Sequence, residues 1–256
     1  MINFNVLSVF LTLFLTTGTS VNLSDFLVIS HRGLPSEAPA HTFMGYDLAI
    51  DQGSDYIEQD VILSEDGHLI VSHDDKLAKG KYISKMTLDE IKEYRTANGE
   101  PFYTLSEIFE RYGKKVNYVI ENKKTDDEFQ TEQAIIEVVK QYGMKNNVVF
   151  QSFFKGSLAY YEDFAPSIPR MILIGKHSNT DFFKHYEKFS YVDLVAVESK
   201  LLTEEVASEL QEVGIKVFAY FVSEPKKESQ RVLNLGLDGI FTDYTGRTFE
   251  ILNEIQ

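Results

Sequence analysis

The chain has 256 residues and a formal net charge of −14, from 25 Lys and Arg against 39 Asp and Glu. Hydrophobic residues make up 43% and charged residues 25%, which excludes an intrinsically disordered chain and a multi-span membrane protein. The negative charge argues against nucleic-acid binding, and the absence of cysteine excludes disulfides, thiolate metal sites and a cysteine nucleophile. These properties favour the remaining interpretation, a single globular domain of ordinary enzyme size.

The first 24 residues carry no ionisable side chain, and residues 6–15 form an apolar run that is too short to span a bilayer comfortably. Gly18 and Ser20 suit positions −3 and −1 of a peptidase site. We therefore expect residues 1–20 to be a secretory signal peptide. The mature domain, 25–256, would then be secreted or held at the cell surface, without a stable membrane span. A buried first element or an uncleaved anchor is the alternative.

From Phe26 onward, short β-type runs alternate with helical stretches, and no linker or low-complexity tract interrupts them. The sequence predicts strands at residues 26–30, 56–63, 69–73, 116–121, 148–152, 171–174, 192–197, 216–222 and 239–242. Apolar residues recur at every third or fourth position in the predicted helices 42–51, 131–142, 203–213 and 226–235.

This alternation favours an α/β fold, a closed (β/α)₈ TIM barrel. An open dinucleotide-binding sheet would also need a Gly-rich phosphate loop, and no GxGxxG is present. Catalytic groups of such barrels collect at the carboxyl ends of the strands. The polar residues there are His31, Arg32, Glu121, Gln151, Ser152, Thr242 and Asp243.

Glu58 and Asp60 lie two residues apart on a predicted strand, so both side chains project to one face. Two neighbouring carboxylates repel each other unless a cation neutralises them. Oxygen ligands suit a hard ion such as Mg²⁺ or Ca²⁺. A solvated acidic face on an edge strand is the alternative interpretation.

The dipeptide Asp66-Gly67 between two β-type runs predicts a two-residue hairpin turn. This turn pairs residues whose numbers sum to 133, so that Asp60 faces His73. A three-residue loop would instead send His73 to the opposite side. His73 is therefore a candidate acid or base, with an ordinary packed histidine as the alternative.

Glu121 and Lys123 share a face at the end of another apolar strand. They are either part of the same site or a plain ion pair at a strand end. His31 and Arg32 follow the first strand, and they supply an imidazole and a guanidinium that can grip a phosphate oxygen.

Taken together, these segments resemble the glycerophosphodiester phosphodiesterase family over nearly the whole mature chain. The resemblance is carried by His31-Arg32-Gly33, Ala38-Pro39-Ala40-His41-Thr42, residues 53–61, Asp66-Gly67, residues 71–74, Glu121-Asn122-Lys123, Gln151-Ser152-Phe153 and residues 236–243. Their order and spacing make the match specific.

The resemblance implies a TIM barrel with a β-hairpin and a short insertion near the active-site rim. It implies metal-dependent hydrolysis of glycerophosphodiesters to glycerol 3-phosphate and an alcohol. On this pattern Glu58, Asp60 and Glu121 would hold one divalent cation, Ca²⁺ or Mg²⁺. His31 and His73 would be the acid and base, and Arg32 and Lys123 would bind the phosphate.

The chain departs from the family pattern in three places. Ala40 replaces a Glu, Tyr220 replaces a Trp, and the segment 75–104 is comparatively short. A glycerophosphocholine-like compound or a wall polyglycerol-phosphate is the expected substrate. The alternatives are a lysophospholipase D-type activity on single-chain lipids and a barrel that binds phosphodiesters without turning them over.

Overall fold

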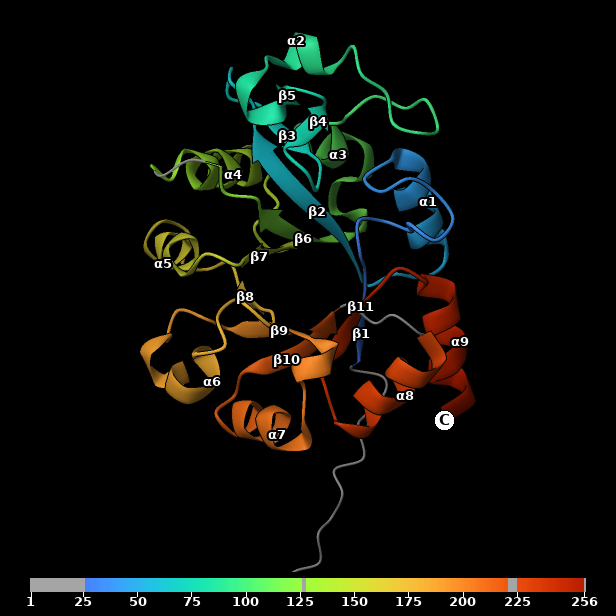
Figure 1. The fold of residues 1–256 in the computed structure, drawn as a ribbon, viewed down its shortest axis with the longest axis vertical. Helices are drawn as coiled ribbons and strands as arrows, with labels where there is room; N and C mark the ends of the chain where they lie inside the picture. The colour runs from blue at the N-terminus through green and yellow to red at the C-terminus, as the bar shows by residue number, and fades with distance from the viewer. Residues whose placement is uncertain (1–25, 126–127, 221–224, 256) are drawn as a thin grey trace, which may run out of the picture.

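The computed structural model describes residues 26–125, 128–220 and 225–255 (Figure 1). Eight parallel strands follow the spatial order β1-β11-β10-β9-β8-β7-β6-β2, and pairing between β1 and β2 closes the sheet. Their bounds are β1 (Leu27–Ser30), β2 (Tyr56–Leu63), β6 (Asn117–Asn122), β7 (Val148–Ser152), β8 (Arg170–Ile174), β9 (Leu194–Glu198), β10 (Lys216–Tyr220) and β11 (Gly239–Thr242). The predicted barrel is confirmed.

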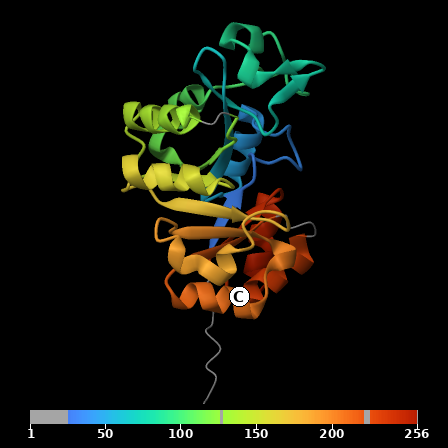
Figure 2. The same cartoon turned by 60° about the vertical axis from the view of Figure 1, so that its left-hand side comes forward.

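The helices between the strands surround the barrel, as the two views in Figures 1 and 2 show. They are α1 (Phe43–Asp51), α3 (Leu105–Tyr112), α4 (Gln130–Gln141), α5 (Lys155–Phe164), α6 (Phe182–His185), α7 (Glu204–Glu212), α8 (Pro225–Asn234) and α9 (Thr245–Ile255). None of the helices within the described residues is both long and apolar enough to cross a bilayer. The predicted signal peptide lies outside the described residues.

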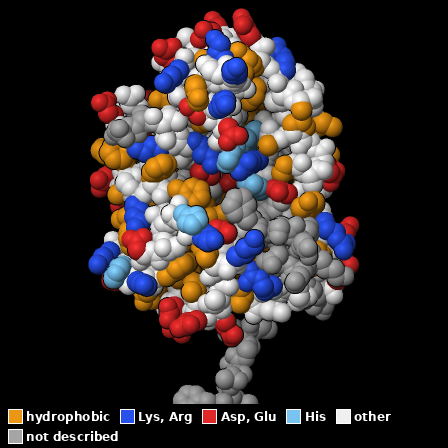
Figure 3. All heavy atoms as spheres, in the orientation of Figure 1, with side chains coloured by type: hydrophobic (Ala, Val, Ile, Leu, Met, Phe, Trp, Pro, Cys, Tyr) orange, Lys and Arg blue, Asp and Glu red, His pale blue; other side chains and the backbone are white. Residues whose placement is uncertain are grey.

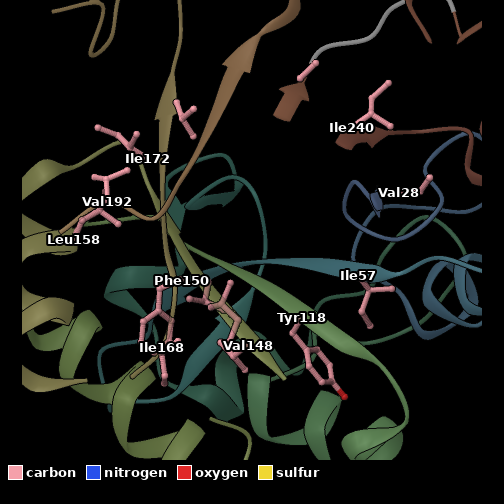
Figure 4. Packing of buried hydrophobic residues seen from close by; sticks show 14 of the residues in the cluster. Val28, Ile57, Tyr118, Val148, Phe150, Leu158, Ile168, Ile172, Val192 and Ile240 are labelled. Atoms are coloured by element: carbon pink, nitrogen blue, oxygen red, sulfur yellow. The ribbon is translucent and has the colours of Figure 1, made fainter. Parts of the chain in front are cut away.

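Successive side chains on each strand point alternately outward to the helices and inward to the barrel axis. Val28, Tyr118 and Phe150 belong to the outer core beneath the helices (Figure 4). Ile29 and Val119, their neighbours in sequence, belong to a separate core inside the barrel. This alternation fixes which side chains at the strand ends face the barrel mouth.

An insertion follows β2 and stands above the barrel in Figure 1. It contains β3 (Leu69–Val71), β4 (Lys76–Ala78), β5 (Lys81–Tyr82) and the short helix α2 (Leu88–Ile91). A small core of its own holds it together, made of Ile62, Ile70, Ile83, Met86 and Ile91. The predicted hairpin and short insertion at the rim are thus confirmed.

The predicted register of the β2–β3 hairpin is wrong by one residue. Val61 pairs with Val71 and Leu63 with Leu69, so paired numbers sum to 132. The reason is a three-residue loop, closed by hydrogen bonds from the Ser64 amide to the His68 carbonyl (2.8 Å) and from the Gly67 amide to the Ser64 carbonyl (3.1 Å). Gly67 has φ +85°, as the third residue of such a loop requires.

Asp60 therefore lies opposite Ser72, whose amide donates to the Asp60 carbonyl (2.9 Å). His73 nevertheless lies near the barrel mouth, because β3 ends at Val71 and the chain bends after it. The pairing register determines which face a side chain takes only within the strand, so it does not determine the direction of His73, which follows the end of β3.

Candidate active site

Three buried carboxylates converge at the mouth of the barrel. Glu58 and Asp60 project from β2, and Glu121 lies beside Asp60 in the parallel pairing of β2 with β6. One oxygen from each lies within 4.8 Å of the other two. Their exposed fractions are 2%, 1% and 6%. Glu58 also accepts a hydrogen bond from the Gln151 amide (3.0 Å).

Burial disfavours the charged form of two of these carboxylates. Burial and the nearby Asp60 carboxylate raise the pKa of Glu121 well above its usual range, and burial also raises the pKa of Glu58. Asp60 Oδ1 is buried and has no hydrogen-bond partner among the described residues. Three buried carboxylates with oxygens within 4.8 Å of one another fit one divalent cation with oxygen ligands, such as Mg²⁺ or Ca²⁺.

Two cationic side chains flank the carboxylates. Lys123 Nζ lies 2.7 Å from Glu121 Oε1 and 3.4 Å from Asp60 Oδ1, and Arg32 Nε lies 3.3 Å from Asp60 Oδ2. Burial opposes the charge of Lys123, but the Asp60 and Glu121 carboxylates outweigh it and raise its pKa. Two cationic side chains thus lie directly beside the carboxylates.

His31 follows β1 and is fixed by two carboxylates. Its Nδ1 donates to Asp243 Oδ1 (2.6 Å), from the turn after β11, and its Nε2 lies 3.7 Å from Glu58 Oε2. Burial disfavours the charged ring, but Glu58 and Asp243 together raise the pKa of His31.

His73 is held in the opposite electrostatic setting. Burial, Lys123 and Arg32 lower its pKa. The ring is 38% exposed, and its Nδ1 donates to Asp74 Oδ1 (2.9 Å). The two histidines at the mouth therefore differ in the direction of their pKa shifts.

A small cavity of about 60 Å³ brings the predicted residues together. Six of the seven line it, and Asp60 lies buried beside them. The remaining wall is mainly apolar and consists of Phe153, Leu173, Tyr220 and Phe241, with the Gln151 amide. Figure 3 shows histidine, acidic and basic side chains gathered at the centre of this face, below the insertion.

A second, larger cavity of about 270 Å³ adjoins the first and shares Arg32 and His73 with it. The insertion contributes most of its other lining, including Lys76, Leu77 and Phe102, and Ala40 also faces it. The mouth of the barrel therefore has two compartments that meet at Arg32 and His73.

The sequence did not identify His41 as a site residue. Its Nε2 donates to Asp60 Oδ2 (2.9 Å), and its Nδ1 lies 2.8 Å from the Tyr46 hydroxyl, which also donates to the Glu58 carbonyl (3.1 Å). His41 lies in a loop, so no strand periodicity points to it. His41 belongs to the segment Ala38-Pro39-Ala40-His41-Thr42 that resembles a motif of the family, and this resemblance could have indicated a role in the site.

Arg32 and His41 both adopt the left-handed backbone conformation, with φ values of +57° and +59°, and the His41 amide donates to the Arg32 carbonyl (2.9 Å). Such backbone is uncommon outside glycine, and it clusters at functional sites. Here both strained residues hold the same oxygen of Asp60.

The glycerophosphoryl diester phosphodiesterase family model matches residues 31–247. A glycerophosphodiester phosphodiesterase of Bacillus subtilis (strain 168) is 28% identical, over 89% of this chain and 86% of its own. One from Caldanaerobacter subterraneus is 30% identical, over 85% and 93%. The structure of an Oleispira antarctica phosphodiesterase, in complex with the product sn-glycerol-3-phosphate, matches with TM-score 0.80 and 26% identity, over 89% and 96%.

Proposed function

The chain belongs to the glycerophosphoryl diester phosphodiesterase family, and from this premise we propose that it hydrolyses glycerophosphodiesters to glycerol 3-phosphate and an alcohol with the help of a divalent cation and two histidines. The observation that carries the proposal is the convergence of three buried carboxylates and two imidazoles on one cavity. Relatives named glycerophosphodiester phosphodiesterase support this reaction, and so does the complex of the Oleispira antarctica phosphodiesterase with the product sn-glycerol-3-phosphate.

Glu58, Asp60 and Glu121 would hold the cation, because they offer oxygen ligands from two adjacent strands. A divalent cation bound there would polarise the phosphate and neutralise charge that develops on it. The donor set contains no nitrogen or sulfur, which favours Mg²⁺ or Ca²⁺ over zinc.

Arg32 and Lys123 would bind the phosphate. Both line the small cavity, and both are partly exposed there at 22% and 18%. Held beside the carboxylates, they can stabilise the additional negative charge of the transition state without moving. The guanidinium can also use its planar set of N–H groups to orient the phosphate.

His31 and His73 would transfer the protons. They line the same cavity, so one imidazole can activate the attacking oxygen while the other protonates the leaving alkoxide. Asp243 fixes the ring of His31 through its Nδ1, which leaves Nε2 directed toward Glu58 and the cavity.

The test is an assay of glycerol 3-phosphate release from glycerophosphocholine after chelator treatment and readdition of Mg²⁺ or Ca²⁺. We expect cation-dependent turnover. His31→Ala, His73→Ala and Glu58→Gln should each lower kcat by at least about 100-fold, since acid–base groups contribute on that scale. His185→Ala is the matched control, because this exposed histidine on α6 contacts Glu187 and not the cavity.

Lysophosphatidylcholine is assayed beside glycerophosphocholine. A preference for the lipid would replace the proposed substrate by a single-chain phospholipid. Binding of glycerophosphocholine without turnover, with either cation present, would replace the hydrolase by a binding protein. Near-normal turnover in any of the three site variants would remove the role assigned to that residue.

A further inference from the structure

The hairpin formed by β4 and β5 concentrates positive charge in an acidic chain. Residues 76–85 contain Lys76, Lys79, Lys81 and Lys85 and no acidic residue, whereas the whole chain has a net charge of −14. All four lysines are exposed. We call these four residues the lysine surface. Basic side chains are visible on this face of the insertion, above the site, in Figure 3.

The lysine surface is not needed to neutralise neighbouring acids. Within residues 26–125, 128–220 and 225–255, none of its four members forms an ion pair. The adjacent acids are engaged elsewhere: Asp74 pairs with His73, and Asp75 accepts hydrogen bonds from the amide and hydroxyl of Ser84, both at 2.8 Å. Asp75 thereby closes the hairpin and leaves the lysines to solvent.

One member of the lysine surface, Lys76, lines the mouth of the active site, and the β4–β5 pairing sets Lys81 opposite Ala78 on the same hairpin. Lys76 lines the 270 Å³ cavity together with Leu77, and Arg32 and His73 line the same cavity. Asp74, at 78% exposure, is the one carboxylate among the described residues that line it. A ligand in this cavity therefore meets two cationic side chains, Lys76 and Arg32, and an apolar part of the lining that includes Val71 and Phe102.

We propose that this cavity and the lysine surface bind the alcohol half of the substrate when that half carries a further phosphate group. The inference rests on the proposed function, because the scissile phosphate would occupy the small cavity on the other side of Arg32 and His73. Lysine ammonium groups bind phosphate as point charges, and several on one hairpin beside a cavity attract an anion over a distance of about 10 Å.

The test compares two substrates that share the glycerol phosphate half. One is glycerophosphoglycerol, and the other carries a second phosphate on its terminal hydroxyl. At low ionic strength we expect Lys79→Gln/Lys81→Gln/Lys85→Gln to lower kcat/KM about tenfold for the phosphorylated substrate and by less than about twofold for the neutral one. Turnover of the neutral substrate shows that the variant is folded. Lys76→Gln should lower the same preference, and so should Ala40→Glu, which adds a carboxylate to the cavity lining.

The matched control removes three charges from the opposite end of the barrel, in Lys140→Gln/Lys145→Gln/Lys216→Gln. These lysines are exposed, beside the amino ends of β7 and β10. The control should change neither substrate by more than about twofold. An equal loss in both triple variants would overturn the inference, because net charge alone would then explain it.

Three further outcomes also decide whether the inference holds. If the hairpin variant loses binding to phosphatidylglycerol vesicles but keeps its substrate preference, the lysine surface contacts a membrane and the inference is wrong. Hydrolysis of glycerophosphoglycerol without any preference for the phosphorylated form would overturn this inference alone. No hydrolysis of either substrate would overturn the proposed function, and the inference with it.

Discussion

The two oxygens of Asp60 lie in different environments. Oδ2 contacts His41 Nε2 at 2.9 Å and Arg32 Nε at 3.3 Å, whereas Oδ1 lies 3.4 Å from Lys123 Nζ. Burial opposes its charge, but the hydrogen bond from His41 and the nearby Lys123 hold the pKa of Asp60 well below its usual range. His41 thereby fixes the carboxylate in its charged form and directs Oδ1 toward Glu58 and Glu121.

We predict that His41→Leu weakens binding of Mg²⁺ or Ca²⁺ by about tenfold or more, because partners that orient a metal ligand contribute on that scale. His41→Gln should retain most of the affinity, since its amide can still donate to Asp60. Isothermal titration of the chelated protein measures both variants, and circular dichroism checks that they fold. Unchanged affinity in a folded Leu variant would show that Asp60 does not depend on His41.

The sequence identified the residues on strands more readily than those in loops. Glu58, Asp60 and Glu121 could be grouped because the period of a strand places alternate residues on one face. Their partners His41 and Tyr46 lie in a loop and in α1. The conformation of this loop depends on left-handed backbone at Arg32 and His41, which cannot be predicted from the identity of these residues. Asp243 was recognised as a residue at a strand end, but its contact with His31 required the closure of β1 on β11.

At the level of elements, the closure of the barrel depends on a glycine. Gly239 begins β11 and pairs with Leu27 on β1 and Phe218 on β10. A Cβ at this position would collide with the Leu27 carbonyl oxygen and would lie 2.6 Å from the Phe218 ring. Both obstacles belong to strands that the barrel holds in place.

Gly239→Ala should therefore lower the free energy of unfolding by about 1–3 kcal/mol, the range for overpacking a close-packed interior. Gly156→Ala is the control, because Gly156 is exposed on α5 and the nearest atom to its new Cβ is 3.7 Å away. There alanine should add roughly 0.5 kcal/mol, since it restricts the unfolded chain. Urea unfolding of both variants gives the comparison. Equal stability of the two would mean that strands β1 and β10 yield to the added methyl group.

The hairpin after β2 shows which features of a turn can be predicted from the local sequence and which cannot. Asp66-Gly67 correctly indicated a turn between two strands, but both two- and three-residue loops accept a glycine with positive φ. The choice is set by Ser64, whose hydroxyl accepts from the His68 amide (2.9 Å) and donates to Asp66 (2.7 Å). One residue of loop length changes every cross-strand pair, which is why the predicted register was wrong.

For the whole molecule, the order of strands and helices was sufficient to predict the barrel. Eight of the predicted runs are the eight strands of the barrel, three of them with the predicted bounds (56–63, 148–152 and 239–242) and five with bounds shifted by a few residues, and the ninth is β3. The insertion was predicted only in outline, because β4 and β5 have three and two residues, too few to show a period. Its small separate core could not be read from sequence, since Ile62, Ile83 and Ile91 are far apart along the chain.

The cluster of Glu58, Asp60 and Glu121 links folding to cation binding. Folding brings three carboxylates within 4.8 Å of one another, and the unfolded chain separates them again. Any cation that binds this cluster binds the native state selectively and stabilises it by mass action. Protons compete for the same oxygens, because burial and Asp60 raise the pKa of Glu121. Lowering the pH adds a proton to Glu121 and so weakens binding of the cation to the cluster.

We predict that Mg²⁺ or Ca²⁺ at about 100 times its Kd raises the Tm of the chelated protein by about 5–10 °C. Such binding adds about 2.7 kcal/mol, and each kcal/mol shifts Tm by about 2–4 °C in a domain of this size. The gain should shrink as pH falls, since Glu121 is then protonated in the unloaded protein. Glu58→Gln should lose most of the gain, whereas Glu198→Gln, a rim carboxylate that accepts from the Lys176 amide, should keep it. Differential scanning calorimetry measures each shift, and a gain that persists undiminished in Glu58→Gln would place the stabilising cation elsewhere.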